Sequence, residues 1–154
     1  MSAVDPLDPS VRQRRLALLA RARLTQLRAC WQGLDGAPGV TRLRGPEIGL
    51  AMIRGRMDAR GDRFNLGEVT MTRASVRLDD DTIGHGYVLG RSLEHAEWVA
   101  TYDALAQQAR FAQVIEATLL APTEHAVEAA RAQRRRRAGA TRCSFDALVR
   151  EASG

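Results

Sequence analysis

His95 and Glu97 form the first pattern in this sequence that could do chemistry. A His-x-Glu pair supplies one zinc ligand and the general acid/base of zinc deaminases, whose other ligands come from a Pro-Cys-x-x-Cys sequence. Neither Cys30 nor Cys143 lies in such a setting, and two distant cysteines indicate neither a metal knuckle nor a disulfide framework. We therefore expect no metal site. The alternative for His95 is a surface or capping residue one turn into a helix.

His85 is the second candidate, because it alternates with Ile83, Tyr87 and Leu89 in the pattern of a strand. A histidine on an apolar face is most often a hydrogen-bonded core residue. Glu68 and Tyr87 nearby in the sheet keep open a role that faces a ligand or an interface. Spacing alone establishes no Ser-His-acid set, since such triads are defined by geometry. The catalytic residues therefore stay unknown at this stage.

Glycine motifs for nucleotides are missing from the sequence. The chain has no lysine and no G-x-x-x-x-G-K-[ST] sequence, and "GHGYVLG" does not open a helix after a parallel strand. A P-loop or a dinucleotide-binding fold is therefore excluded. Gly84 and Gly86 instead predict that a helix or another backbone lies close to this strand.

The hydrophobic spacing predicts the elements that position these residues. Residues 10 to 34 have leucines on one face and arginines on the other, which predicts one long N-terminal amphipathic helix. The apolar run 48–53 predicts a strand buried on both faces, and 68–78 and 83–89 predict two more strands in an antiparallel meander. Ser92 is a helix cap, and further helices follow, with a break at Pro122 and a last helix over 124–138. The fold class is α+β, with a small antiparallel sheet of three to four strands packed with a long N-terminal helix and C-terminal helices.

One irregularity concerns the strand that follows "RGDRFNLGE". Val69 and Met71 are apolar at odd positions, whereas Ala74, Val76 and Leu78 are apolar at even positions. A regular strand cannot keep both sets on one face. We expect either a β-bulge near residues 72–73, or that the first half of this strand is covered on its other face by a helix or a partner chain.

Length and composition restrict the class of protein. The 154 residues suit a single domain over 1–154, with residues 1–9 flexible, and 45% hydrophobic residues suit a soluble globular chain. The 23 basic residues are all arginine and give a formal charge of +5. Arginine holds phosphate or carboxylate through two parallel hydrogen bonds, although GC-rich coding bias explains the same composition. The sequence lacks an export signal and a membrane span, so we expect a cytoplasmic protein without membrane contact.

Five segments in series resemble the PhnG family, the G subunit of the bacterial carbon-phosphorus lyase core complex. They are "RRLALLARA" (14–22), "LRGPEIGLAMIRGR" (43–56), "FNLGEVTMTRASVRL" (64–78), "GHGYVLGRSLEHAEWVATYDAL" (84–105) and "TRCSFDALVR" (141–150). Ala74 stands where the family often has a cysteine, which argues against a thiol or metal role at this position.

The resemblance implies a subunit of a multi-subunit transferase that is not active alone. In the family, the G subunit works with the H, I and L subunits to make α-D-ribose 1-methylphosphonate 5-triphosphate from ATP and methylphosphonate, with release of adenine. A J subunit later breaks the carbon-phosphorus bond, in the catabolism of organic phosphonates. The resemblance implies no cofactor bound by this chain alone and ATP as a substrate of the complex.

The second functional hypothesis is a small basic RNA-associated or general interaction protein, which the charge suggests. Few aromatic residues interrupt the basic segments, so we expect no specific nucleic-acid binding. In isolation we expect self-association, because an obligate subunit leaves an apolar interface uncovered. The residues that we select as facing an interface or a substrate are Asn65, Glu68, Arg73, His85, Tyr87, Arg91, His95 and Glu97. Of these, Asn65 and Glu68 are expected at the edge of an interface first and in catalysis second.

Overall fold

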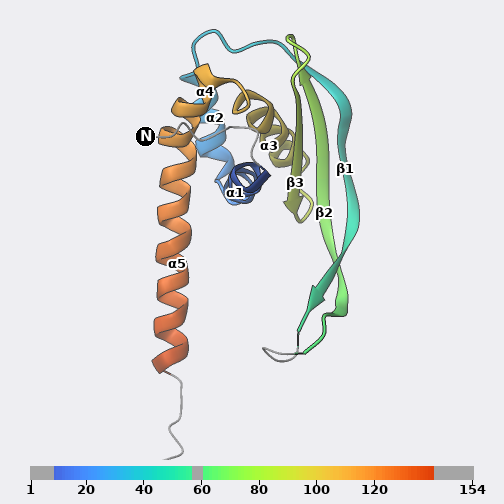
Figure 1. Cartoon of the computed structure of the whole chain (residues 1–154), viewed down its shortest axis with the longest axis vertical. Helices are drawn as coiled ribbons and strands as arrows, with labels where there is room; N and C mark the ends of the chain where they lie inside the picture. Colours follow the sequence, from blue (N-terminus) through green and yellow to red (C-terminus); the bar gives the residue numbers. More distant parts are fainter. Residues whose placement is uncertain (1–8, 57–60, 141–154) are drawn as a thin grey trace, which may run out of the picture. The chain divides into compact units, whose positions relative to one another are not determined.

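The computed structural model describes residues 9–56 and 61–140 (Figure 1). In chain order the elements are α1 (Pro9–Leu19), α2 (Leu24–Gln32), β1 (Val40–Gly55), β2 (Phe64–Leu78), β3 (Ile83–Leu89), α3 (Leu93–Leu105), α4 (Ala109–Ile115), the π-helical turn η1 (Glu116–Leu120) and α5 (Ala121–Ala140). The chain divides into two compact units, residues 1–123 and residues 124–154. The sheet and helices α1 to α4 belong to the first unit.

The sheet is three-stranded and antiparallel in the order β1-β2-β3, which confirms the predicted meander and the α+β class. Helices α1 to α4 lie on one side of it (Figure 1). Ala74, Val76 and Leu78 of β2 face these helices and are buried together with Val99 and Leu105 of α3. The core of the first unit therefore lies between the sheet and α3.

Helix α3 lies against β3 at two glycines, as the sequence predicted. A Cβ atom on Gly84 would overlap with the carbonyl oxygen of Ala100, and one on Gly86 would overlap with that of Ala96. The backbones therefore approach more closely than any side chain on β3 would allow.

The predicted long N-terminal helix is wrong, because the chain forms two short helices separated by residues 20–23. Arg23 is extended, with φ −75° and ψ 142°, and its backbone N–H donates to Gln26 Oε1 at 3.0 Å, so that a capping interaction starts α2. The Leu19 carbonyl at the end of α1 lies 3.2 Å from His95 Nε2 of α3. A tertiary partner and a local cap thus replace the hydrogen bonds of a continuous helix.

The prediction that residues 48–53 form a strand buried on both faces is also wrong. The strand extends over Val40–Gly55, and Ile48, Leu50, Met52 and Ile53 are all exposed, with Leu50 at 66%. The reason is position: β1 is an edge strand, and its second half pairs with the part of β2 that precedes the β2–β3 ladder. An apolar run predicts a surface that is buried from water, but it does not distinguish burial within the same chain from burial against another molecule.

The change of phase in β2 needs no β-bulge at residues 72–73. Pairing between β2 and β3 is regular from Met71 to Arg77, and the nearby irregularities lie on β1, between Arg42 and Arg44 and between Arg44 and Glu47. Thr72 occupies a fully buried position and donates through its hydroxyl to the Gly90 carbonyl at 2.7 Å. Thr72 therefore belongs to the same buried face of β2 as Ala74, Val76 and Leu78, although its side chain is polar. That a partner chain covers the other face of the first half of β2 stays a prediction.

The predicted helix break at Pro122 is wrong as well. The π-helical turn η1 leads directly into α5, with the Ala121 N–H bonded to the Glu116 carbonyl, so that Pro122 lies in the first turn of α5. A proline is tolerated there because the wider turn has already changed the hydrogen-bond pattern. In the second unit, α5 ends in an exposed basic run, Arg134 to Arg137. Cys143 lies outside the described residues.

Tyr102 gives the first prediction, on the pH dependence of stability. The side chain is fully buried and donates to the Leu27 carbonyl at 2.7 Å, and burial, followed by the hydrogen bond with Cys30, raises the pKa of its hydroxyl. A raised pKa in the folded state stabilises the fold below the unfolded pKa of about 10, and this stability is lost as the pH rises above that value. The free energy of unfolding, measured with urea from pH 8 to 11, should therefore fall above about pH 10.

The control for this pH dependence is Tyr102→Phe. We expect the variant to be less stable by about 1 kcal/mol at pH 8, because one hydrogen bond is lost, and to have a flatter alkaline profile. The chain contains no lysine, so few other groups titrate in this range. Parallel profiles for the two proteins would contradict the assignment to Tyr102.

Candidate functional site: the outer sheet face and its depression

The outer face of the sheet, opposite the helices, brings together two rows of polar side chains. Cross-strand partners share a face, so Arg44, Ser75 and His85 form one row across β1, β2 and β3. Glu47, Arg73 and Tyr87 form the next row. The structure thus places three of the selected residues, Arg73, His85 and Tyr87, as neighbours on one face.

His85 is fixed in the first row by two contacts. Its Nδ1 lies 2.9 Å from the Ser75 hydroxyl, and its backbone N–H donates to Asp103 Oδ2 of α3 at 3.0 Å. His85 is half-buried rather than a core residue, and a role that faces a ligand or an interface stays a prediction. Gln107, in the turn after α3, also donates to the Ile83 carbonyl at 2.9 Å. Asp103 of α3 and Gln107 of the following turn therefore bind backbone groups at the edge of β3 next to this row.

Asp103 is the centre of a charged cluster behind His85. The carboxylate is fully buried and accepts from Arg12 Nε at 3.1 Å, from Arg12 Nη2 at 2.6 Å and from Arg15 Nη2 at 3.3 Å. The hydrogen bond to Asp103 raises the pKa of the Arg12 guanidinium, which is a third exposed. Two cations on one carboxylate leave a net positive charge beside the outer face.

A depression of about 730 Å³ opens at the His85 row. Its lining combines cationic and neutral hydrogen-bonding groups with two acidic residues of the β2–β3 turn. The residues that line it are Arg12, Leu43, Arg44, Ser75, Asp80, Asp81, Thr82, Ile83, His85 and Gln107. Arg12, Arg44 and Asp103 were missed by the sequence reasoning, because Arg12 and Asp103 are 91 positions apart and nothing in the local pattern connects them.

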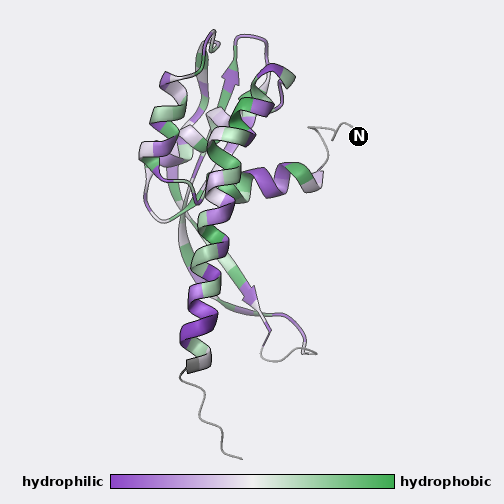
Figure 2. Cartoon of the chain, turned by 90° about the vertical axis from the view of Figure 1, so that its left-hand side faces the viewer, coloured by the Kyte–Doolittle hydropathy of each residue, from purple (hydrophilic) through white to green (hydrophobic). Residues whose placement is uncertain are grey.

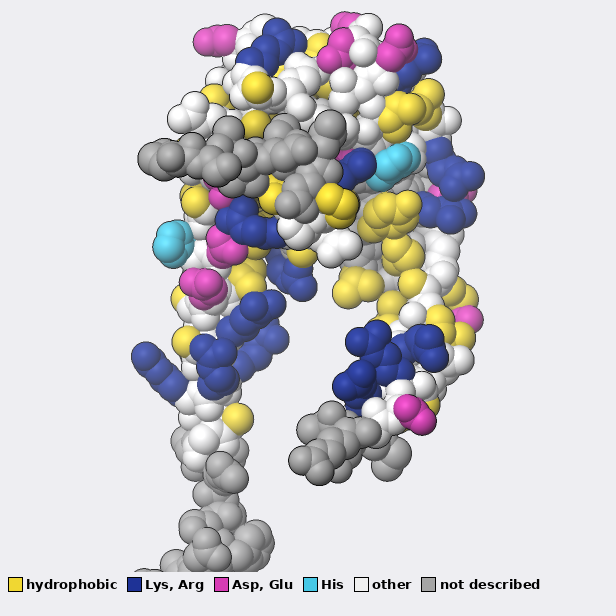
Figure 3. All heavy atoms as spheres, in the orientation of Figure 1, with side chains coloured by type: hydrophobic (Ala, Val, Ile, Leu, Met, Phe, Trp, Pro, Cys, Tyr) yellow, Lys and Arg dark blue, Asp and Glu magenta, His cyan; other side chains and the backbone are white. Residues whose placement is uncertain are grey.

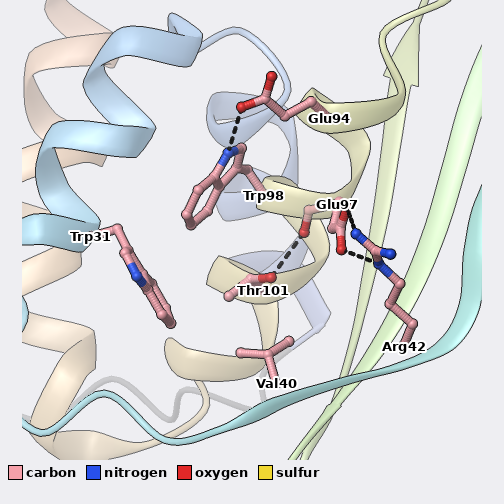
Figure 4. A pocket seen from close by; sticks show the side chains of 7 residues that line it. All are labelled: Trp31, Val40, Arg42, Glu94, Glu97, Trp98 and Thr101. Atoms are coloured by element: carbon pink, nitrogen blue, oxygen red, sulfur yellow. Dashed lines mark hydrogen bonds and ion pairs between the residues drawn. The ribbon is translucent and has the colours of Figure 1, made fainter.

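A second pocket, of about 580 Å³, lies on the helix side of the sheet (Figure 4). Trp31 of α2 and Trp98 of α3 meet there edge to face, with ring centroids 5.5 Å apart. Val40 and Arg42 of β1 complete the lining with Glu94, Glu97 and Thr101 of α3.

The charges of this pocket are paired within the protein. Glu97 accepts from Arg42 Nε at 2.5 Å and Nη2 at 3.0 Å, while Glu94 accepts from Arg28 at 2.7 and 2.6 Å. The hydrogen bonds from Arg28, and then from Trp98, lower the pKa of Glu94. Glu97 and Arg42 therefore join β1 to α3, and the geometry of Glu97 is that of a structural ion pair.

The β-arm, defined as residues 50–55 of β1 and 64–70 of β2, carries two other selected residues. Asn65 pairs with Arg54, and Glu68 pairs with Met52. In Figure 1 the paired strands extend beyond β3, and Figure 2 colours much of this stretch as hydrophobic. Figure 3 shows hydrophobic side chains along the arm and basic side chains towards its end. Asn65 and Glu68 are thus separated from the His85 row and lie on an exposed apolar surface.

The remaining selected residues do not join the outer face. His95 contacts the end of α1 and so has the structural role described above. Arg91 is exposed and lies two residues after the end of β3 at Leu89. Within the described ranges, no group of three or more His, Cys, Asp or Glu side chains is placed to hold a metal ion. The described helices also include none with the length and hydropathy needed to cross a membrane.

Comparison with known proteins identifies the family of this chain. The family model described as "Phosphonate metabolism protein PhnG" matches residues 10–151. The chain belongs to the PhnG family. A curated relative from Rhizobium meliloti (strain 1021), named "Alpha-D-ribose 1-methylphosphonate 5-triphosphate synthase subunit PhnG", is 44% identical over 150 residues, which cover 93% of this chain and 92% of the relative. Membership of the PhnG family favours the first of the two functional hypotheses over an RNA-associated protein.

Proposed function

We propose that this PhnG-family chain is a subunit of the synthase that makes α-D-ribose 1-methylphosphonate 5-triphosphate in phosphonate metabolism. The observation that carries the proposal is the 44% identity, over 93% of this chain, to a relative with that name. The substrates would be ATP and methylphosphonate, with release of adenine, and the setting would be the cytoplasm. The chain would bind no cofactor of its own, and ATP would be a substrate of the complex.

The β-arm supports a role in assembly with partner subunits. Five of its large apolar side chains are exposed: Leu50, Met52, Ile53, Phe64 and Leu66. A two-stranded ribbon is barely stable in water alone, and an exposed apolar surface of this kind is typical of protein interfaces. We infer that the arm packs against a partner of the same system, with the H, I and L subunits as the partners in the synthase and the J subunit acting on a later intermediate.

The genetic test of this function is growth on methylphosphonate as the sole source of phosphorus. A strain that lacks this gene should fail to grow on methylphosphonate and should grow normally on inorganic phosphate. The intact gene should restore growth. Growth of the deletion strain on methylphosphonate would overturn the proposed function.

The second prediction concerns assembly, with Leu50→Glu and Leu66→Glu as the variants. Their side chains are 66% and 60% exposed, so their replacement should change the free energy of unfolding by about 0.5 kcal/mol or less. A charge buried at an interface is costly, so recovery of the partner subunits with tagged chain should fall at least about tenfold.

The matched control for the arm is Val114→Glu on α4, where the side chain is 41% exposed. We expect this variant to retain its partners, because it adds the same charge at an exposed apolar position outside the arm. Full recovery of partners with both arm variants would show that the arm is not an assembly surface. Equal loss with Val114→Glu would show an effect of charge alone.

A further inference from the structure

The depression is lined by two guanidiniums, Arg12 of α1 and Arg44 of β1, each with N–H groups that take part in none of the contacts described above. Arg12 binds Asp103 through Nε and Nη2, and neither bond uses Nη1. Arg44 has one contact with Glu47, at 3.4 Å, whereas Arg73 contacts the same carboxylate oxygen more closely, at 2.5 Å. Both guanidiniums line the depression at His85.

The Ser75–His85 pair also presents a donor to this depression in each of its protonation states. If the Ser75 hydroxyl donates to His85 Nδ1, then Nε2 carries the hydrogen and can donate to a ligand. If Nδ1 carries the hydrogen, it donates to Ser75, whose hydroxyl can then donate to the ligand. An imidazolium has both hydrogens.

We propose that the depression beside His85 binds a phosphorus oxyanion, a phosphate ester or a phosphonate, through Arg12, Arg44 and the Ser75–His85 pair. Planar guanidinium forks match the oxygens of such a group. Neighbouring strands are about 4.8 Å apart, so a row across three strands places its donors around one small ligand. Any oxyanion would suit these donors, and the choice of a phosphorus oxyanion rests on the proposed function.

The acidic residues of the depression determine which end of it receives the anion. Asp81 pairs with Arg77 at 3.6 Å, and Asp80 accepts from the Thr82 N–H at 3.1 Å and from Gln108 at 2.8 Å. The hydrogen bond with Thr82 lowers the pKa of Asp80, so this carboxylate is ionised at neutral pH. The two carboxylates repel an anion from the β2–β3 turn and favour its position at the Arg44 end of the row.

The binding test uses the full chain with inorganic phosphate, methylphosphonate and tripolyphosphate as separate probes, at about 0.15 M salt to screen unspecific attraction. We expect saturable binding in calorimetry of at least one probe. The probe that binds most tightly identifies the phosphonate or the phosphate chain as the group that is recognised. Arg44→Ala and His85→Gln should each weaken that binding at least about tenfold, which is the loss expected when a charge-assisted hydrogen bond is removed.

Two further variants distinguish specific binding in the depression from nonspecific attraction of anions to the positive charge of the chain. Arg54→Ala removes the same charge from the same strand, outside the depression, and should leave the affinity unchanged. Asp81→Asn should strengthen binding several-fold, and its backbone, at φ 65°, suits asparagine. Equal weakening by Arg54→Ala and Arg44→Ala, or no saturable binding of any probe, would overturn the proposal.

Failure of the anion site and failure of the proposed function give different results in the binding and growth experiments. If the Arg44 and His85 variants bind every probe as tightly as the native chain but the deletion strain cannot grow on methylphosphonate, the anion site is wrong and the proposed function stands. If anion binding follows the prediction but the deletion strain grows normally, the site stands and the proposed function is wrong.

Discussion

Gly86→Ala is expected to destabilise the protein by about 3 kcal/mol, the upper part of the usual range for overpacking. The new methyl group would overlap with the Ala96 carbonyl oxygen and lie 2.7 Å from the Ala100 backbone nitrogen. Both atoms belong to the backbone of α3, so no side-chain rotation relieves the overlap. Chemical unfolding, followed by circular dichroism, measures the loss.

The control for this prediction is Gly49→Ala on β1. No atom lies within 4 Å of a Cβ built at Gly49, so we expect a change of about 0.5 kcal/mol or less. The difference between the two variants isolates the contact of α3 with β3, because each adds one methyl group to a strand. Similar values for Gly49→Ala and Gly86→Ala would mean that the close approach does not limit stability.

Asp103→Asn is expected to cost about 3–5 kcal/mol, because it leaves two arginines without their buried counter-charge. The Asp103 carboxylate is fully buried and joins α1, through Arg12 and Arg15, to the backbone of His85 in β3. Its loss should therefore loosen α1 and the edge of the sheet together. Hydrogen exchange should show reduced protection at His85 and in α1, and urea unfolding should give the free energy.

The control is Glu116→Gln, which removes an exposed carboxylate that accepts from Arg14 at 2.9 and 3.2 Å. Exposed ion pairs contribute about 0–1 kcal/mol, and salt screens them. We therefore expect a small effect that disappears in high salt, whereas the effect of Asp103→Asn should persist. An Asp103→Asn variant as stable as the native chain would show that the cluster does not hold α1 in place.

All three strands could be located from the sequence, but only for β2 and β3 do the local signals agree with the final packing, because the apolar run of β1 is exposed. Residues 83–89 form β3 as predicted, since the alternation of side chains and the two glycines both require a strand under a helix. The first helical region was predicted as one helix, because its leucine spacing continues across residues 20–23. Its interruption depends on a contact with His95, 76 positions away from Leu19. Local periodicity carries no information about such a contact.

The candidate site also combines residues that local patterns predicted with residues whose roles depend on distant contacts. Strand alternation put His85 on one face with Tyr87, and the register adds Arg73 to that face as the partner of Tyr87. His95 and Glu97 were selected from a motif, and the fold assigns both to structural contacts. The spacing of a motif along a helix does not say which neighbouring element its side chains meet.

The sequence by itself determined the α+β class, the order of the three strands, the close approach at Gly84 and Gly86 and the resemblance to the PhnG family. These features depend on local patterns or on residue identities in series. Only the tertiary structure decided that β1 is exposed and that Arg12, Arg44 and His85 surround one depression. The physical reason is that burial and charge clustering arise between residues far apart in the chain, where side-chain periodicity gives no distance.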